Sequence, residues 1–482
     1  MIENLENLKI KYYKLKNNAK GRKKGDIRAF VGVRTWFHEM NLLNNNGNDK
    51  YKAHIEAFEL SLNELEKSLE NGSFDCFFNE SINCWINRKK HIGKKGNGAP
   101  ILKLPIPKIK DVKKNGLNII SLFSGALGLD LGFLAAGFNL RLTNDICRMS
   151  KATINKNMPG VPFLLNDIQE VPTNKILESA GLKFSEVDVL TGGPPCQPFS
   201  TAGKRKALND PRSSPLKEFI RVVKEMQPRA FVMEEVTGIL SSRLKHIPIK
   251  ERNRDGTLKP EEEKGSVFKA VLSMLDSTGY NYIYSIMNAA DFGAPQIRKR
   301  VIFIGLRDDI PSFPQKTHSD HCGQTLFEKK TSIWNSFWES AVDLQGNEKN
   351  NEFLKLSKSL ENYMKFIPPG GYWRHFPEDI IKEAMGGAYF SGGGKMGFFR
   401  RLSWDEPSPT IVTTPVQKGT LLFHPEEMRL LSIAEYKRIQ GFPDDWEILG
   451  NLNDKYRLIG DAVPVYLSYS IARKVASLLK RN

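Results

Sequence analysis

The chain has 482 residues and a formal net charge of +17, from 71 lysines and arginines against 54 aspartates and glutamates. This balance favours a polyanionic partner such as nucleic acid. The five cysteines show no paired Cys-x-x-Cys spacing, so neither a disulfide framework nor a metal site is predicted. No apolar run approaches the length of a membrane span, and we expect a cytoplasmic protein without a membrane partner.

Residues 1–115 form a basic region of their own, with 23 basic against 13 acidic residues. Apolar residues recur at steps of three and four from Ile55 to Leu69, which predicts one face of a helix. Basic clusters at 20–24 and 88–90 flank this stripe, and they either contact phosphate groups or form a solvated surface. We therefore expect a basic, largely helical N-terminal extension.

From Leu117 the pattern changes to strand, turn and helix. Residues 119–123 read as a buried strand, a turn with two glycines follows at 124–128, and an apolar helix comes next. Such a turn lets a ligand approach the backbone amides at the start of the helix. A second strand ends at Asp145, where an acidic side chain either binds ribose hydroxyls or caps the next helix.

Further strands continue this alternation. The third strand is predicted to end at 166–168. The four strands after it are predicted at 187–191, 230–236, 280–286 and 301–305. Strands that alternate with helices in this way predict an α/β fold with a largely parallel sheet.

The fourth strand runs into Gly-Gly-Pro-Pro-Cys-Gln-Pro-Phe-Ser at 192–200. The glycines allow a sharp turn, and the prolines stiffen the loop that carries Cys196. A free cysteine is often a small buried hydrophobe. A cysteine held in a rigid loop at the end of a strand is the better candidate for a nucleophile.

Two further segments carry charged candidates. The fifth strand ends in Glu234 and Glu235, and its apolar neighbours predict that at least one carboxyl is partly buried with a raised pKa. Arg298 and Arg300 precede the last strand, and their alternation places them on one face. These arginines are either site residues or partners in surface ion pairs.

Taken in order, these motifs resemble those of the DNA (cytosine-5) methyltransferases of bacterial restriction-modification systems. The resemblance covers residues 117–306 and 399–476, where 400–411, 439–443 and 459–464 look like the closing motifs. It implies a Rossmann-like, S-adenosylmethionine-dependent methyltransferase domain at 116–307 and a smaller, irregular target-recognition region at 308–398. Residues 399–482 are then expected to return to the catalytic domain.

The resemblance also implies a set of site residues. The catalytic residues would be Cys196, Glu234, Arg298 and Arg300. The S-adenosylmethionine site would be formed by Phe123, Ser124, Gly125, Gly128, Asp145, Ile146, Asp167, Ile168, Pro195, Leu216, Asp461, Ala462 and Val463. Contacts with double-stranded DNA are expected from Gln197, Ser200, Gln296, Tyr372, Arg374 and Arg401. No metal is implied. We expect a monomer, with a cognate restriction endonuclease as its genetic partner.

Three positions depart from the family pattern. Leu127 replaces a usual glycine, so we expect a backbone less free to adopt a positive φ. Glu235 and Asp461 each place a carboxylate where the family has asparagine. Two other interpretations remain: the same chemistry on RNA, and a DNA-binding regulator on an inactive methyltransferase scaffold.

Overall fold

The computed structural model describes residues 109–195, 214–245, 258–320, 331–345, 352–391 and 397–480. Almost all of the predicted N-terminal extension lies outside these residues, as do Cys196, Gln197 and Ser200. None of the described helices has the length and apolar character that crossing a membrane needs.

A seven-stranded sheet forms the centre of the larger lobe, in the order β3-β2-β1-β4-β5-β8-β6. The first five strands of this order pair in parallel, and β8 pairs antiparallel with both β5 and β6. The strands are β1 (Asn118–Leu122), β2 (Asn139–Asn144), β3 (Phe163–Leu164), β4 (Val189–Gly192), β5 (Ala230–Val236), β6 (Asn281–Asn288) and β8 (Lys299–Leu306). The predicted α/β class is therefore confirmed.

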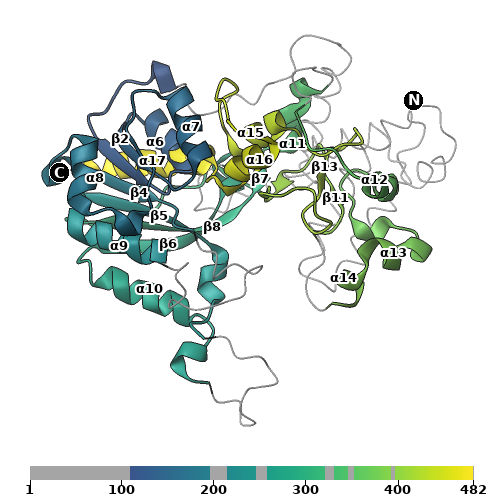
Figure 1. Cartoon of the computed structure of the whole chain (residues 1–482), viewed down its shortest axis with the longest axis horizontal. Coiled ribbons are helices and arrows are strands. Elements are labelled where there is room, and N and C mark those ends of the chain that lie inside the picture. The colour runs from purple at the N-terminus through teal and green to yellow at the C-terminus, as the bar shows by residue number, and fades with distance from the viewer. Residues whose placement is uncertain are drawn as a thin grey trace, which may run out of the picture.

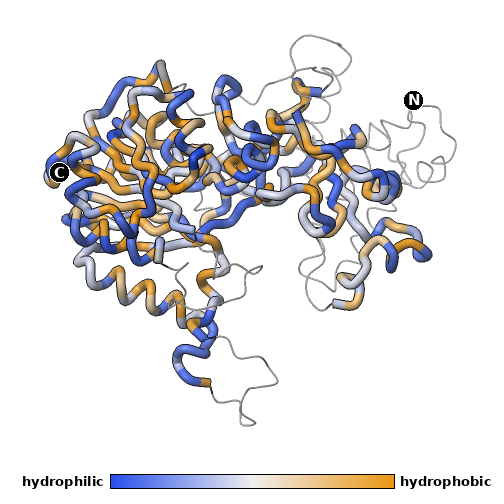
Figure 2. Tube along the Cα trace, in the orientation of Figure 1, coloured by the Kyte–Doolittle hydropathy of each residue, from blue (hydrophilic) through white to orange (hydrophobic). Residues whose placement is uncertain are grey.

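Helices cover both faces of this sheet (Figure 1). Apolar side chains of α6, α7 and α17 belong to the hydrophobic core on one face, and those of α8, α9 and α10 belong to the core on the other. These helices are α6 (Gly128–Ala135), α7 (Arg148–Asn157), α8 (Thr173–Ala180), α9 (Ser214–Met226), α10 (Ser266–Asp276) and α17 (Val465–Leu479). Figure 2 shows hydrophobic residues concentrated along the strands between these layers, as expected for a sheet buried on both faces.

The C-terminal helix α17 packs directly on α6, the first helix of the fold. A Cβ atom at Gly132 of α6 would lie 2.3 Å from Ser468 Oγ of α17, which is too close for any side chain. Close approach at this glycine brings the end of the chain back to the first strand–helix unit. The expected return of the C-terminal segment to the catalytic domain has this physical basis.

The smaller lobe consists of short elements around its own apolar cluster. Its helices include α12 (Lys358–Met364), α13 (Glu378–Met385) and α14 (Gly387–Phe390), and β11 (Arg400–Arg401) pairs with β13 (Leu422–Phe423). Phe376 and Phe399 pack edge to face at its centre, with ring centroids 5.0 Å apart. The cluster also contains Leu421 and Leu430, so its residues lie on both sides of position 398.

Several elements join the two lobes. The two-residue strands β7 (Gln296–Ile297) and β12 (Ser408–Pro409) pair with each other. The helices α11 (Phe337–Ala341), α15 (Ile433–Gln440) and α16 (Leu452–Asp461) lie in the middle of the molecule between the two lobes (Figure 1). A last two-stranded sheet pairs β9 (His318–Ser319) with β10 (Ser332–Ile333).

Candidate active site

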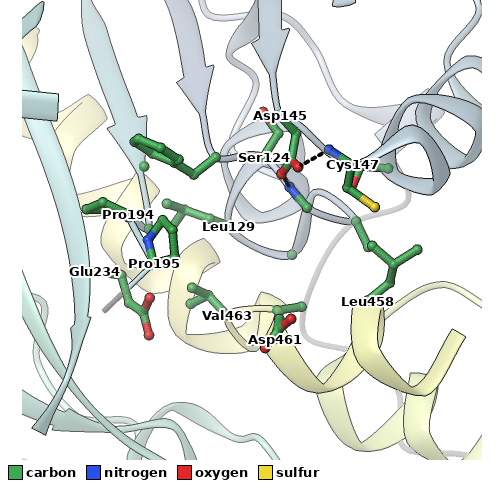
Figure 3. Close-up of a pocket in the computed structure, with 18 of the residues that line it drawn as sticks. Ser124, Leu129, Asp145, Cys147, Pro194, Pro195, Glu234, Leu458, Asp461 and Val463 are labelled. Atoms are coloured by element: carbon green, nitrogen blue, oxygen red, sulfur yellow. Dashed lines mark hydrogen bonds between the residues drawn. The ribbon is translucent and has the colours of Figure 1, made fainter. Parts of the chain in front are cut away.

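A cavity of about 650 Å³ lies where the parallel strands end. The chain runs from β1 outward to β2 and β3, and then from β4 outward to β5, so the winding reverses between β1 and β4. Ligands of doubly wound α/β proteins bind at this reversal. Residues 121–126, 128–130, 144–147, 192–195 and 234–236 line one side of the cavity, and residues 410–413, 457–458 and 460–463 line the other (Figure 3).

The turn after β1 has an unusual backbone. Phe123, Gly125 and Leu127 have φ values of +55°, +52° and +69°. The expectation that Leu127 would avoid a positive φ is wrong: the residue adopts the left-handed conformation and caps α6 without a side-chain hydrogen bond. Its side chain is completely buried in the core, and this burial holds the strained backbone in place.

Asp145 follows β2 and fastens this turn. Its Oδ2 accepts a hydrogen bond from Gly125 N at 2.9 Å, and its Oδ1 accepts one from Cys147 N at 2.8 Å. Burial raises the pKa of Asp145, and the two backbone N–H groups oppose that rise. The Asp145 side chain also lines the cavity. The next residue, Ile146, is 71 % exposed, so the cavity has an apolar wall beside Asp145.

The third strand is shorter than expected. β3 covers only Phe163–Leu164, and Asp167 does not lie in a strand. Instead it accepts a hydrogen bond from Gln169 N and caps the short helix η3 (Ile168–Glu170). Asp167 and the buried Ile168 still line the cavity.

Glu234 and Arg300 meet at the β5 end of the cavity. Arg300 Nε lies 2.7 Å from Glu234 Oε1, and the two side chains are 14 % and 11 % exposed. A Cβ atom at Gly193 would lie 3.0 Å from Glu234 Oε2, so the glycine turn after β4 approaches this carboxylate closely. Glu235 is also buried and lies in the lining of the same cavity.

Arg298 lines the same cavity but is held in a different way. Its guanidinium donates hydrogen bonds to Gly460 O at 2.8 Å and to Ile411 O at 3.2 Å. Burial lowers its pKa to about 9, and the nearby charge of Arg300 adds to this effect. Because Arg298 ties the last sheet region to two segments of the C-terminal wall, it fixes the geometry of the cavity.

The C-terminal wall carries Asp461, Ala462 and Val463, which the resemblance assigns to the cofactor site. Burial raises the pKa of Asp461, whereas Arg298 and Arg457 oppose that rise. The sequence reading did not single out Arg457, whose guanidinium lies 3.5 Å from Cys147 Sγ. Arg457 lies four residues before Asp461 in a helix, and residues at this spacing are neighbours on the helix surface. This spacing could have identified Arg457 from the sequence.

These features fit S-adenosylmethionine. The volume lies in the usual range for small-molecule sites. Gly125 has open space where a Cβ would stand, the Asp145 carboxylate lines the cavity where a ribose could meet it, and Ile146 offers an apolar surface. Pro195, which also lines the cavity, is the residue directly before Cys196.

Three residues predicted for the site are placed elsewhere by the structure. Leu216 is 1 % exposed in the hydrophobic core, and its neighbour Pro215 lines the cavity. Gln296 was predicted to contact DNA, but it is fully buried: it donates to Gln440 Oε1 at 2.8 Å and accepts from Ile411 N at 3.0 Å.

Arg401, the third of these, was also predicted to contact DNA. Its guanidinium donates to Ile367 O at 2.9 Å and to His424 O at 3.1 Å, and the residue is 9 % exposed. Burial lowers its pKa. These hydrogen bonds hold the Arg401 side chain inside the smaller lobe, away from the surface where DNA would bind.

The other two DNA candidates lie closer to open surface. Arg374 is exposed, and its guanidinium lies 5.5 Å from the centroid of the Trp373 ring. Tyr372 lines a second cavity, of about 520 Å³, between the lobes. Its lining also includes Arg400 and Ile297, which the sequence reading did not propose as contacts, and Thr410, which is shared with the first cavity.

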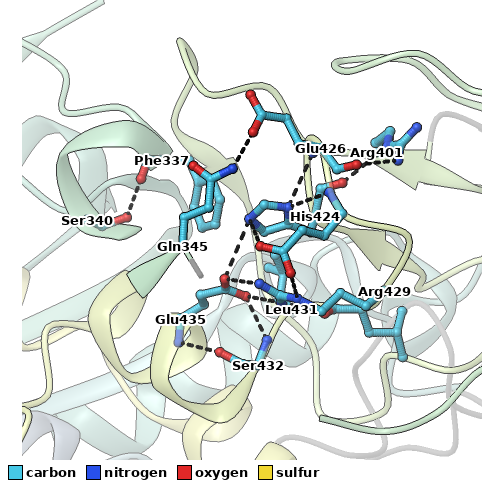
Figure 4. A network of polar contacts seen from close by, with 12 residues as sticks. Phe337, Ser340, Gln345, Arg401, His424, Glu426, Arg429, Leu431, Ser432 and Glu435 are labelled. Carbon is cyan, nitrogen blue, oxygen red and sulfur yellow. Dashed lines mark hydrogen bonds and ion pairs between the residues drawn. The ribbon is translucent and has the colours of Figure 1, made fainter. Parts of the chain in front are cut away.

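A buried polar network supports the junction between the lobes (Figure 4). Arg429 donates two hydrogen bonds to Glu435, at 2.9 and 2.8 Å, and Ser432 caps α15 in front of Glu435. His424 Nδ1 accepts from Glu427 N at 2.9 Å. The sequence reading missed this network, although a serine three residues before a glutamate is a recognisable capping signal.

Comparison with known proteins is consistent with this geometry. The C-5 cytosine-specific DNA methylase family matches residues 117–477. The chain is 32% identical to the type II methyltransferase M.Eco47II of Escherichia coli over 404 residues, covering 84% of this chain and 89% of that protein. It is also 32% identical to the type II methyltransferase M.Sau96I of Staphylococcus aureus, over 77% of this chain and 79% of that protein.

Among solved structures, a DNA modification methyltransferase encoded within a prophage (E. coli) has the same fold. It aligns with a TM-score of 0.50 and 23% identity, covering 76% of this chain and 99% of that one. The chain therefore belongs to the C-5 cytosine-specific DNA methylase family and is a DNA (cytosine-5) methyltransferase.

Proposed function

We propose that this enzyme uses S-adenosylmethionine to methylate carbon 5 of one cytosine within a specific double-stranded DNA sequence. The observation that carries the proposal is the close ion pair of Glu234 and Arg300 in the same cavity as the Asp145 turn. The Glu234–Arg300 pair could contact the cytosine, and Asp145 could bind the ribose of the cofactor. Both line the cavity in which one cofactor molecule would lie.

The cofactor would lie along the ends of the strands. Asp145 would accept hydrogen bonds from the ribose hydroxyls, Ile146 would pack on the adenine, and Asp167 would contact the adenine edge. The turn at 123–128 would surround the methionine part. When bound, S-adenosylmethionine supplies an electrophilic methyl group.

Cys196 would act as the nucleophile. Its thiolate would form a bond to carbon 6 of the cytosine, which makes carbon 5 electron-rich enough to accept the methyl group. Loss of the proton from carbon 5 then returns electrons to the ring and expels the cysteine. No redox partner is needed for this sequence.

Glu234 and Arg300 would stabilise the ring while the cysteine is attached. Glu234 would supply a proton to ring nitrogen 3, and Arg300 would orient Glu234 and contact the base oxygen. The raised pKa predicted from the sequence for this carboxyl pair stays a prediction. Arg298 would act as a positioning residue, because its guanidinium is occupied by backbone carbonyls.

The DNA would lie between the lobes, with the target base rotated out of the helix into the catalytic cavity, because a stacked base cannot be attacked on its face. Tyr372 and Arg400 in the second cavity, together with the exposed Arg374, are the proposed contacts. The loop from Gln197 to Ser200 would close over the rotated base. Residues 308–398 would carry sequence recognition.

The biological role would be protection of host DNA. The relatives are named type II methyltransferases, and we propose that this enzyme likewise acts as the modification partner of a restriction endonuclease, as a monomer in the cytoplasm. Family membership favours DNA over RNA as the substrate.

A direct test uses the purified full chain with radiolabelled S-adenosylmethionine, unmethylated plasmid DNA and, in parallel, total tRNA. Bisulfite sequencing of the plasmid should then reveal 5-methylcytosine at one recurring sequence. Label in tRNA alone would assign the enzyme to RNA. Label in neither substrate, from protein that binds the plasmid, would support the inactive regulator instead.

A further inference from the structure

We propose that Asp461 makes the cofactor cavity select the positively charged S-adenosylmethionine over its neutral product, S-adenosylhomocysteine. This inference rests on the proposed function, because it concerns the same cavity. The two molecules differ at one sulfur atom, which carries a methyl group and a positive charge only in S-adenosylmethionine.

The location of Asp461 suits this role. It is the last residue of α16, it lines the cavity, and its side chain is accessible there. Figure 3 shows it across the cavity from Ser124 and Asp145. The reacting sulfur of S-adenosylmethionine is bonded to the 5′ carbon of the ribose, and its methyl group must reach the base. In a bound cofactor the sulfur would therefore lie between the Asp145 end and the Glu234 end of the cavity. Asp461 is close enough to both carboxylates to interact with their charges.

The surroundings of this carboxylate are unfavourable when no ligand is bound. A negative charge at the carboxyl end of a helix is repelled by the helix dipole. Burial raises the pKa of Asp461, Arg298 and Arg457 oppose that rise, and the smaller like-charge repulsion from Glu234 and Asp145 adds to it. An asparagine, which the family usually has here, would avoid all of these penalties.

The nearby arginines do not neutralise Asp461 through hydrogen bonds. Arg298 donates to the backbone carbonyls of Gly460 and Asp461, at 2.8 and 3.4 Å, and not to the carboxylate. Arg457, one turn earlier, donates to Asp454 at 3.1 Å. Within the described part of the chain, no group donates a hydrogen bond to the Asp461 carboxylate. A cationic ligand in the cavity would therefore meet a carboxylate whose hydrogen-bonding capacity the two arginines do not use.

The consequence concerns turnover. An amide at this position interacts similarly with a sulfonium and with a thioether, whereas a carboxylate attracts only the sulfonium. Loss of that charge on methyl transfer removes the attraction, so the product is held more weakly than the substrate. Asp461 therefore favours exchange of spent cofactor for fresh cofactor.

The test is isothermal titration calorimetry of the full chain with S-adenosylmethionine and with S-adenosylhomocysteine, in the absence of DNA. For Asp461→Asn, we expect S-adenosylmethionine binding to weaken about tenfold and S-adenosylhomocysteine binding to change less than about twofold. Asp461→Glu keeps the charge and should keep a Kd ratio close to that of the wild type.

The matched control is Asp188→Asn. Asp188 is a partly buried carboxylate at the opposite end of β4, where it accepts from Asn118 N at 2.7 Å and pairs with Arg229. This variant should leave the Kd ratio unchanged.

The outcomes separate this inference from the proposed function. If Asp461→Asn weakens both ligands equally, the carboxylate contacts a group that they share, and charge selection is overturned. An unchanged ratio overturns it as well. If wild-type protein binds neither ligand, the proposed cofactor site and this inference both fail.

Discussion

Arg300 Nε lies 2.7 Å from Oε1 of Glu234, and both side chains are largely buried at the end of the sheet. Glu234 belongs to β5 and is opposite Ile302 of β8 in the antiparallel register, so the start of β8 brings Arg300 alongside it. The pair depends on an antiparallel strand beside a parallel one. This pairing positions the two charged groups that we propose act on the cytosine.

The first prediction concerns that pair. Arg300→Lys keeps a positive charge but loses the planar guanidinium that can contact a carboxylate and a base together. We expect the single-turnover rate of methyl transfer to fall about 10²- to 10³-fold, the usual effect of removing a group that stabilises charge in the transition state. DNA affinity should change little. A single-turnover rate within threefold of the wild type would contradict the assigned role of Arg300.

The second prediction concerns Gln296, which is buried between lobes. Gln296→Ala leaves Ile411 N and Gln440 Oε1 without this partner, and each lost buried hydrogen bond costs about 1–3 kcal/mol. The melting temperature should fall, and the methylated sequence should stay the same. Arg374→Ala is the contrasting variant: this exposed side chain should leave the melting temperature unchanged and weaken DNA binding. A stable Gln296→Ala protein with altered site preference would restore the DNA role.

The third prediction concerns the strained residue Leu127, whose φ is +69°. Leu127→Ala loses buried packing worth about 2–5 kcal/mol and keeps the unfavourable backbone. Leu127→Gly loses the same packing but relieves about 1–2 kcal/mol of left-handed strain. Chemical denaturation should therefore rank the wild type above the glycine variant, and the glycine variant above the alanine variant. Equal stability of the two variants would argue against strain at this residue.

The fourth prediction concerns Asp130, which is fully buried in the first turn of α6 and accepts a hydrogen bond from Thr191 Oγ1 at 3.0 Å. Burial raises its pKa from 3.8 to about 6. The unfolded protein therefore releases this proton at a lower pH than the folded protein does. The stability that Asp130 contributes is present below about pH 4 and is lost as the pH rises toward 6.

Asp130→Asn removes this titration. The free energy of unfolding of the variant, relative to wild type, should rise by about 3 kcal/mol between pH 4 and pH 7, since one pKa unit corresponds to about 1.4 kcal/mol. Asp379→Asn, at an exposed position on α13, gives the same change of charge and should show a nearly constant difference. Parallel pH profiles for wild type and Asp130→Asn would show that the buried carboxyl does not titrate in this range.

The local sequence pattern was sufficient to predict the features that depend only on residues close together in the chain. The strands β4 and β5, the turn after β1, Asp145 at the end of β2 and Glu234 at the end of β5 all follow from apolar runs and the residues that interrupt them. Each of these strands ends at the same edge of the parallel part of the sheet, so their last residues necessarily meet.

Features that depend on distant partners were not predictable in this way. Gln296 was assigned to DNA from the resemblance of its motif to one of the family's, but it is buried against residues 411 and 440. Arg401 is likewise held by carbonyls of residues 367 and 424. The Leu127 backbone follows from tertiary packing of its side chain, which outweighs the local preference against a positive φ.

The central claim is that this chain methylates cytosine through a bond between Cys196 and carbon 6 of the base. Duplex DNA that contains the target sequence with 5-fluorocytosine tests it, because fluorine cannot leave carbon 5 as a proton does and the adduct cannot resolve. With S-adenosylmethionine present, mass spectrometry of the digested complex should show the modified base attached to Cys196, and Cys196→Ser should give no adduct. An adduct on another residue, or no adduct from protein that methylates ordinary DNA, would contradict the account.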